Sequence, residues 1–258
     1  MSFILIPILA FIPAFFWFFI FLREDRFYPE PKKLIIKVFF LGLLTGLLAA
    51  LIEGVFSFIS PGIFDKLLSD FFGESGVASI PLIYLPLVIA IIIGFSAVEE
   101  ILKISVVKRF AYRDPNFNQI VDGAIFGISS ALGFAVLENL GYFVIIAVQE
   151  GLALFIIVFI FRFFATTLLH SLTTGISGYY LGKSKFTGNR SFYLKGLLGA
   201  IALHSVFNLL LVVGVIGIGV NIILLLFTFV FLIRRMESFE AQTIWRLVLL
   251  KDLKAPPA

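Results

Sequence analysis

The sequence predicts an all-α, polytopic transmembrane helix bundle with about seven spans. The 258 residues are 60% hydrophobic and only 14% charged, with a mean hydropathy of +1.10, whereas soluble domains are about half apolar and a quarter charged. Several apolar runs reach the length of about 20 residues that a helix needs to cross a bilayer. These runs are continuous rather than alternating, so they indicate helices and not the strands of a membrane β-barrel.

Seven apolar segments are predicted as spans, and charged, polar or glycine-rich stretches separate them. A charged, proline-containing loop at residues 23–33 ends the first span, and a polar hinge at 112–118 separates the third from the fourth. A glycine-rich turn at 214–219 precedes the seventh, since clustered Gly, Pro and polar residues interrupt helices. In order, the predicted spans are residues 3–22, 34–58, 82–109, 120–148, 152–182, 196–213 and 220–233.

Two spans carry a pattern of small residues that lets neighbouring helices approach closely. These patterns are Gly42-xxx-Gly46 in the second span and Gly123-xxx-Gly127 in the fourth. Residues 61–72 have one apolar and one charged face, which predicts a short interfacial helix.

We expect a single transmembrane domain at residues 1–235, followed by a cytoplasmic amphipathic tail at residues 236–258 that lies on the membrane surface.

The distribution of basic residues predicts the orientation of the chain in a cell membrane. The first, third and fifth loops and the tail hold 4, 3, 4 and 5 of the 20 Lys and Arg residues, while the second, fourth and sixth loops hold 1, 0 and 0. By the positive-inside rule the amino terminus lies outside and the carboxyl terminus inside. The chain has no cysteine, which excludes disulfides and thiolate catalysis, and no nucleic-acid partner is expected.

Two adjacent carboxylates, Glu99 and Glu100, lie deep inside the third predicted span. Lys103 follows at i,i+4 and i,i+3, so its ammonium can neutralise either carboxylate. Holding ionisable residues within a membrane span costs several kcal/mol, which makes a functional site with partner residues the default interpretation.

The later spans offer such partners. Glu138 and Asn139 lie in the fourth span, Arg162, Thr166 and His170 in the fifth, and His204 and Asn208 in the sixth. At about 1.5 Å of rise per residue, Glu99 and His204 lie roughly 14 Å from the inner surface. Glu138 lies roughly 16 Å from the outer surface and His170 roughly 19 Å from the inner one. Because all four fall in one layer near the bilayer centre, we expect them to share one site.

Residues of these types support two chemical schemes, and the sequence leaves both open. In one, a carboxylate takes a proton from water, a histidine donates a proton, and an Asn or second His stabilises the oxyanion. In the other, Glu and His side chains hold a catalytic zinc ion. No His-Glu-x-x-His helix is present, so ligands for a metal have to come from different spans.

The chain resembles the PrsW-type intramembrane proteases, within the wider group that includes the CAAX prenyl proteases. The resemblance extends from about residue 23 to 210, and in the CAAX branch the second motif ends in His, so Glu138 favours the PrsW branch. It rests on four ordered motifs, together with the first loop and Asp122-Gly123: Glu99-Glu100-x-x-Lys103, Phe134-x-x-x-Glu138-Asn139, His170, and His204-x-x-x-Asn208.

The resemblance implies a protease that cuts a single-span anti-sigma factor at a first site, with a stress response released after a second cut. It implies that Glu99 activates water, with Glu138 and one histidine assisting. His204 and Asn208 would then support the oxyanion.

The candidate residues fall into three groups. As catalytic residues we name Glu99, Glu100, Glu138, His170, His204 and Asn208; as metal ligands Glu99, Glu138, His170 and His204; and as supporting residues Lys103, Asn139 and Arg162. Glu100 with Lys103 also fits a structural ion pair, and Arg162 fits a structural counterion to a Glu.

The alternative from another class is a proton- or ion-coupled transporter, because Glu and His relays also mark ion pathways. The absence of an internal repeat weighs against it.

Overall fold

The computed structural model describes residues 5–23, 29–59, 85–149 and 151–253, with side chains to residue 237 except those of 57, 59 and 149. Within these ranges the regular structure is helical throughout. The elements are α1 (Leu5–Leu22), α2 (Lys32–Ile59), α4 (Leu85–Phe110), α5 (Ile120–Gln149), α6 (Gly151–Phe161), the π-helix η4 (Arg162–Thr166), α7 (Thr167–Thr187), α8 (Ser191–Val212) and α9 (Val215–Leu253).

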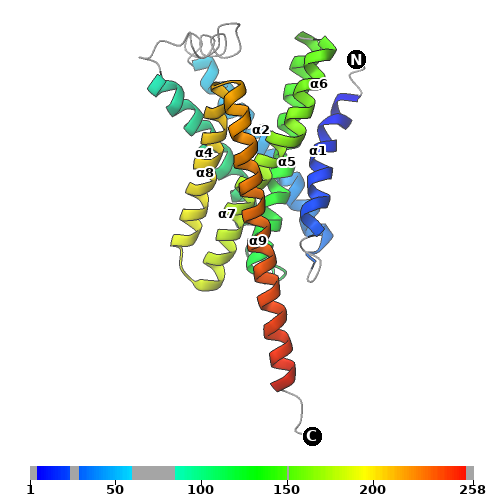
Figure 1. Ribbon diagram of the computed structural model, residues 1–258, viewed down its shortest axis with the longest axis vertical. Helices are drawn as coiled ribbons and strands as arrows, with labels where there is room; N and C mark the ends of the chain where they lie inside the picture. Colours follow the sequence, from blue (N-terminus) through cyan, green and yellow to red (C-terminus); the bar gives the residue numbers. More distant parts are fainter. Residues whose placement is uncertain (1–4, 24–28, 60–84, 150, 254–258) are drawn as a thin grey trace.

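The prediction of seven spans is confirmed. The described residues contain seven helices or helical runs long and apolar enough to cross a membrane, and the protein is a multi-pass membrane protein. Figure 1 shows these helices packed side by side, with the two termini at opposite ends of the molecule. The fifth span is composite, because α6, η4 and α7 form one continuous run at Gly151–Thr187.

The last span differs from the prediction in where it begins and in how far its helix continues. The last span begins at Val215 rather than at residue 220, because the turn after α8 takes only Val213 and Gly214, with Gly214 at φ +74°. The backbone of α9 then continues without a break to Leu253, past the lower end of the bundle (Figure 1). The interfacial helix expected at 61–72 lies outside the described residues, and the amphipathic tail stays a prediction.

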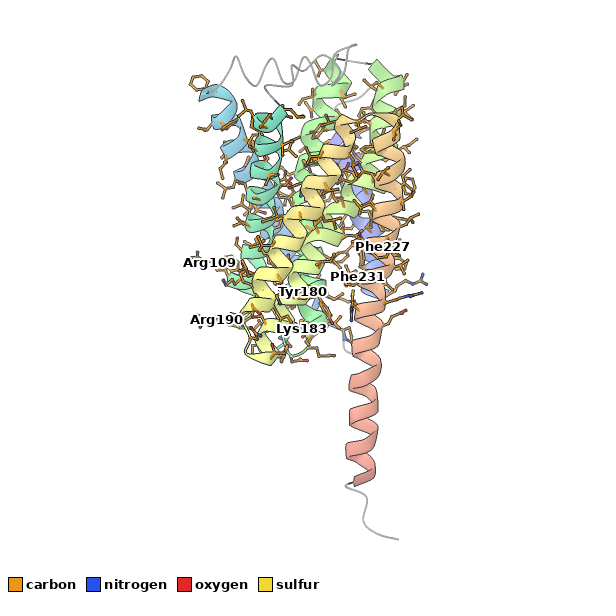
Figure 2. The ribbon with its side chains drawn as sticks, turned by 60° about the vertical axis from the view of Figure 1, so that its left-hand side comes forward. Arg109, Tyr180, Lys183, Arg190, Phe227 and Phe231 are labelled. Atoms are coloured by element: carbon orange, nitrogen blue, oxygen red, sulfur yellow. The ribbon has the colours of Figure 1, made fainter. Side chains whose placement is uncertain are left out.

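The basic residues gather at one end of the bundle. Figure 2 shows Arg109 at the end of α4, Lys183 near the end of α7 and Arg190 between α7 and α8, all at the end from which α9 extends. The third and fifth loops, which the charge count places on the same side of the membrane, therefore share one end of the molecule.

Helix α5 lies at the centre of the bundle, where it packs against α7, α2, α1 and α4. Its small residues make this possible: a methyl group on Gly123 or Gly127 would clash with the backbone of α7 at Gly178 and Thr174. A methyl group on Gly42 of α2 would likewise clash with the backbone of α5. Both predicted glycine patterns therefore lie at helix contacts with backbone against backbone, as small-residue seams allow.

The connection between α4 and α5 is fastened to the end of α7. The Lys185 ammonium donates to the carbonyl oxygens of Tyr112 and Phe117 at 2.6 and 2.7 Å. The Asp122 carboxylate accepts from the backbone N–H groups of Asn118 and Gln119, both at 2.6 Å, and so caps the start of α5. These bonds fix α4, α5 and α7 relative to one another at this end.

The backbone seam between α2 and α5 predicts a position-specific effect of adding a methyl group. In Gly133→Ala the new Cβ would clash with the Phe39 carbonyl oxygen, and overpacking of this kind costs about 1–3 kcal/mol. The midpoint of thermal unfolding of the purified protein in detergent should therefore fall.

Gly199→Ala on α8 is the matched control, because its Cβ would meet no heavy atom within 4 Å. Alanine is also the better helix former, so the midpoint should stay constant or rise. An equal fall of the unfolding midpoint in both variants would contradict the close backbone contact between α2 and α5.

Candidate functional site

The ionisable residues named from the sequence come from four different helical runs. Glu99, Glu100 and Lys103 lie on α4, and Glu138 and Asn139 on α5. Arg162 begins η4 and His170 follows on α7, while His204 and Asn208 lie on α8. The structure brings Glu99, Glu100, Lys103, Glu138, Arg162, His170 and His204 into one connected cluster.

Glu100 is the most enclosed member of the cluster, with no exposed surface. Its Oε1 lies 2.6 Å from the Lys103 ammonium and 2.9 Å from Nδ1 of His204. The hydroxyl of Thr173 donates to Oε1 and that of Thr174 to Oε2, both at 2.9 Å. A charge buried in this way needs several donors to offset its lost hydration. Glu100 therefore ties α4, α7 and α8 together.

His204 has its hydrogen placement fixed by Glu100. A carboxylate only accepts, so Nδ1 of His204 donates to it. In the neutral imidazole the lone pair is then on Nε2, and this atom lies 3.9 Å from Oε2 of Glu99.

His170 has the opposite arrangement. Its Nδ1 lies 3.0 Å from the Lys103 ammonium, and because an ammonium only donates, Nδ1 is the acceptor. The hydrogen is therefore on Nε2, which lies 2.6 Å from Oε2 of Glu138. Each imidazole thus turns one nitrogen to a carboxylate and the other to the space around Glu99.

Oε2 of Glu99 has no hydrogen-bond partner among the described residues. Three nitrogens surround it: Nζ of Lys103 at 3.7 Å, Nδ1 of His170 at 3.8 Å and Nε2 of His204 at 3.9 Å. The Glu99 side chain is 12% exposed, whereas Glu100 is closed off. Glu99 is therefore the carboxylate of the α4 pair that can meet another molecule.

Glu138 is held from its other side by Arg162. The guanidinium Nη2 lies 3.1 Å from Oε1 of Glu138, and Nε donates to the amide oxygen of Asn139 at 2.7 Å. The amide of Asn139 donates in turn to the hydroxyl of Thr167 at 3.2 Å. The guanidinium also lies over the ring of Tyr142 at 4.0 Å. Arg162 is therefore the counterion of Glu138, where the sequence indicated only that it could neutralise a nearby Glu.

Asn208 stands apart from the charged cluster. Its amide donates to the hydroxyl of Ser96 at 3.4 Å, and in the described structure it makes no hydrogen bond to a Glu or His. Because Asn208 follows His204 by four residues and Ser96 precedes Glu99 by three, this pair lies one turn from the Glu99–His204 contact.

Sequence reasoning missed Thr173 and Thr174, both of which bind Glu100. They follow His170 at i+3 and i+4, so the helical period from His170 could have found them. It also missed Phe134 as a wall of the site: its ring centroid lies 5.4 Å from that of His170 and 4.7 Å from the Lys103 ammonium.

Three side chains of the cluster form a group that could hold a metal ion. The ligand atoms offered by Glu99, His170 and His204 all lie within 4.8 Å of one another. Ligands of a tetrahedral zinc ion lie about 2.0–2.1 Å from it and hence about 3.3 Å apart, so small side-chain rotations would close the set. The remaining nitrogens of the two imidazoles face Glu138 and Glu100, as outer carboxylates do in metal sites.

Comparison with known protein families gives a match over most of the chain. Residues 30–234 match the family described as "PrsW family intramembrane metalloprotease". The chain is 30% identical to the protein named Protease PrsW of Clostridioides difficile (strain 630) over 210 residues, which cover 80% of this chain and 79% of that protein. It is 27% identical to Protease PrsW of Geobacillus kaustophilus (strain HTA426) over 193 residues, 74% of this chain and 72% of that one.

The match to Protease PrsW of Bacillus subtilis (strain 168) is 26% over 171 residues, 66% of this chain and 65% of that protein. No solved structure gives a significant match. All the residues of the charged cluster lie inside the matched range. The chain therefore belongs to the PrsW family of intramembrane metalloproteases.

Proposed function

We propose that this protease cuts a peptide bond in or near the membrane segment of a single-span membrane protein, with a metal ion held by Glu99, His170 and His204. The observation that carries the proposal is the convergence of Oε2 of Glu99, Nδ1 of His170 and Nε2 of His204. A carboxylate and two imidazoles with a fourth position left for water are the donor set of catalytic zinc sites.

The chemistry of the donor set supports this assignment. The N–H of His204 donates to Glu100, and Nε2 of His170 lies 2.6 Å from Oε2 of Glu138, so each imidazole has an outer carboxylate that can raise its basicity as a ligand. The Glu99 oxygen among them lacks a hydrogen-bond partner in the described structure. Lys103 and a metal ion cannot share Nδ1 of His170, so binding requires Lys103 to give up that contact and keep its 2.6 Å pair with Glu100.

An ion held there would lower the pKa of water and polarise the scissile carbonyl. The residues around it would handle the proton and orient the peptide. Glu100 is closed off, and Glu99 is a ligand in this scheme, whereas the side chain of Glu138 is 26% exposed. We therefore assign to Glu138 the acceptance of the proton that water releases and its delivery to the leaving amine.

We assign to the Asn208 amide a hydrogen bond to the developing oxyanion, a role for which such donors are suited. Asn208 lies one turn from His204, and its present partner is only the Ser96 hydroxyl at 3.4 Å, a long bond that a stronger acceptor would replace.

The position of the site supports a membrane-embedded substrate. Glu99, Glu138 and His170 all lie well inside the apolar runs of their spans, at a depth that the membrane segment of a substrate reaches. The resemblance to PrsW proteases adds an anti-sigma factor as the specific substrate.

Glu99→Gln should abolish both ion binding and cleavage, because an amide is a poor ligand for zinc-class ions. The measurement is cleavage of a fluorescent single-span anti-sigma factor in proteoliposomes, with fragments identified by mass spectrometry. Glu138→Gln is the matched variant: it should weaken ion binding by no more than the about 10- to 100-fold expected for an outer partner of His170, still bind the ion at saturating zinc, and lose about 10²- to 10⁴-fold in turnover, the usual contribution of a general base. Normal turnover in Glu99→Gln would remove Glu99 from the reaction.

Removal of the ion should stop the reaction reversibly. Dialysis of the purified protein against a membrane-permeant chelator should lower cleavage to background, and one equivalent of zinc should restore it. Folding is monitored in parallel by circular dichroism, because the ion pairs of Glu100 should keep the metal-free protein folded. Full activity in protein shown by elemental analysis to contain no metal would overturn the metal scheme.

A further inference from the structure

The fifth span is interrupted by a single turn of π-helix at Arg162–Thr166. The N–H of Thr167 donates to the carbonyl oxygen of Arg162, five residues back instead of four. A π-turn of this length corresponds to one extra residue inserted into an α-helix, and such bulges often occur at functional sites. The Trp17 indole of α1 donates to the carbonyl oxygen of Phe163 at 2.7 Å, which gives the bulge a fixed partner.

The extra residue changes which side chains share a face. Arg162 and His170 are eight residues apart, and at 100° per residue a regular α-helix would place them about 80° apart around the axis. With one residue absorbed by the bulge, the effective separation is seven residues, or about 20°. The bulge therefore aligns Arg162 with His170, two turns along the same face.

This alignment lets two cationic or donor groups of one span contact one carboxylate of another. Nη2 of Arg162 lies 3.1 Å from Oε1 of Glu138, and Nε2 of His170 lies 2.6 Å from Oε2 of the same residue. Arg162 is nearly fully buried, and Asn139 fixes its Nε at 2.7 Å. The Glu138 carboxylate is therefore held at both oxygens.

We propose that the π-bulge at Arg162–Thr166 places Arg162 on the same face as His170, where it forms its ion pair with Glu138. Arg162 is then a positioning residue that acts through Glu138 on His170. Arg162 contacts neither Glu99 nor either imidazole in the described structure. By fixing Glu138 it keeps the N–H of His170 on Nε2 and the lone pair on Nδ1, directed at the site. The inference rests on the proposed function and names the element that holds its geometry in place.

A double-mutant cycle on Arg162 and Glu138 tests the route of this effect. Loss of an outer-shell partner typically costs about 10- to 100-fold in metal affinity or activity, so Arg162→Met should lower both zinc affinity and turnover by that factor. Zinc affinity is measured by competition with a chromophoric chelator, independently of cleavage. The zinc affinity and turnover of Arg162→Lys should lie between those of the wild type and Arg162→Met, because lysine keeps the charge but lacks the planar guanidinium that binds two acceptors.

The decisive comparison is Arg162→Met added to Glu138→Gln. If Arg162 acts only through Glu138, the double variant has the zinc affinity of Glu138→Gln alone. A further loss in the double variant, equal to that of Arg162→Met by itself, would overturn the inference. If the wild-type protein neither binds zinc nor cleaves, the proposed function fails instead, and the two failures are thereby distinguished.

Changes of chain length test the register directly. Deletion of Phe164, which is 57% exposed, makes His170 the seventh residue after Arg162 in a regular helix and should preserve zinc affinity and turnover. Insertion of one alanine after Phe164 rotates Arg162 by about 100° and should reproduce the loss seen in Arg162→Met.

The same insertion between Ile156 and Ile157 of α6 is the matched control. It leaves the Arg162–His170 spacing intact and should cost little zinc affinity. Equal losses of zinc affinity for both insertions would show that the bulge does not act by aligning Arg162 with His170. A loss of zinc affinity on deletion of Phe164, in a protein that remains folded, would show the same.

Discussion

The Glu100 carboxylate is the constraint on which the rest of the site depends. A fully buried charge within a membrane span is tolerated only when donors replace its lost water. Lys103 from its own helix, His204 from α8 and two threonines from α7 supply those donors. Because each donor comes at a fixed height on its helix, satisfying Glu100 also fixes the relative heights of α4, α7 and α8. The Glu99 carboxylate and the two imidazoles then meet as a consequence.

The packing of the bundle makes these contacts reachable. Short side chains such as Thr173, Thr174 and Asn139 bridge two helices only when the backbones lie close together. The glycines of α5 and α7 provide that approach, because backbone meets backbone where Gly123 and Gly127 contact α7. The small-residue seams and the polar cluster therefore depend on each other: without the seams the polar groups would be too far apart to satisfy one another.

Much of this arrangement could be predicted from the sequence, because it depends on hydropathy and on distances counted along the chain. Length and hydropathy predicted the seven spans, and counting residues from the span ends placed Glu99, Glu138, His170 and His204 in one layer. The pairing of Arg162 with a Glu and of Glu100 with Lys103 followed from the cost of buried charge. Two features escaped prediction because they depend on the rotation of helices about their axes.

The first feature is the π-bulge. Arg162, Thr166 and His170 are spaced at i, i+4 and i+8, yet over eight residues a regular helix drifts by about 80°, and the inserted residue removes that drift. The second is the set of partners chosen by hydroxyl and amide groups. Nothing in the order of residues shows that Asn208 meets Ser96 or that Lys103 reaches His170, because these contacts depend on how α4, α7 and α8 are turned.

The Lys103 ammonium, 2.6 Å from Glu100, 3.0 Å from His170 and 3.7 Å from Glu99, gives the cluster a counterion of its own. Two adjacent carboxylates in the bilayer core would otherwise need an external cation before the helices could assemble. With Lys103 in place, the helices can assemble around these carboxylates before any metal ion is bound. In the proposed scheme the ion would enter afterwards, as Lys103 leaves His170 and keeps its pair with Glu100, so assembly of the bundle would not depend on the metal supply of the cell.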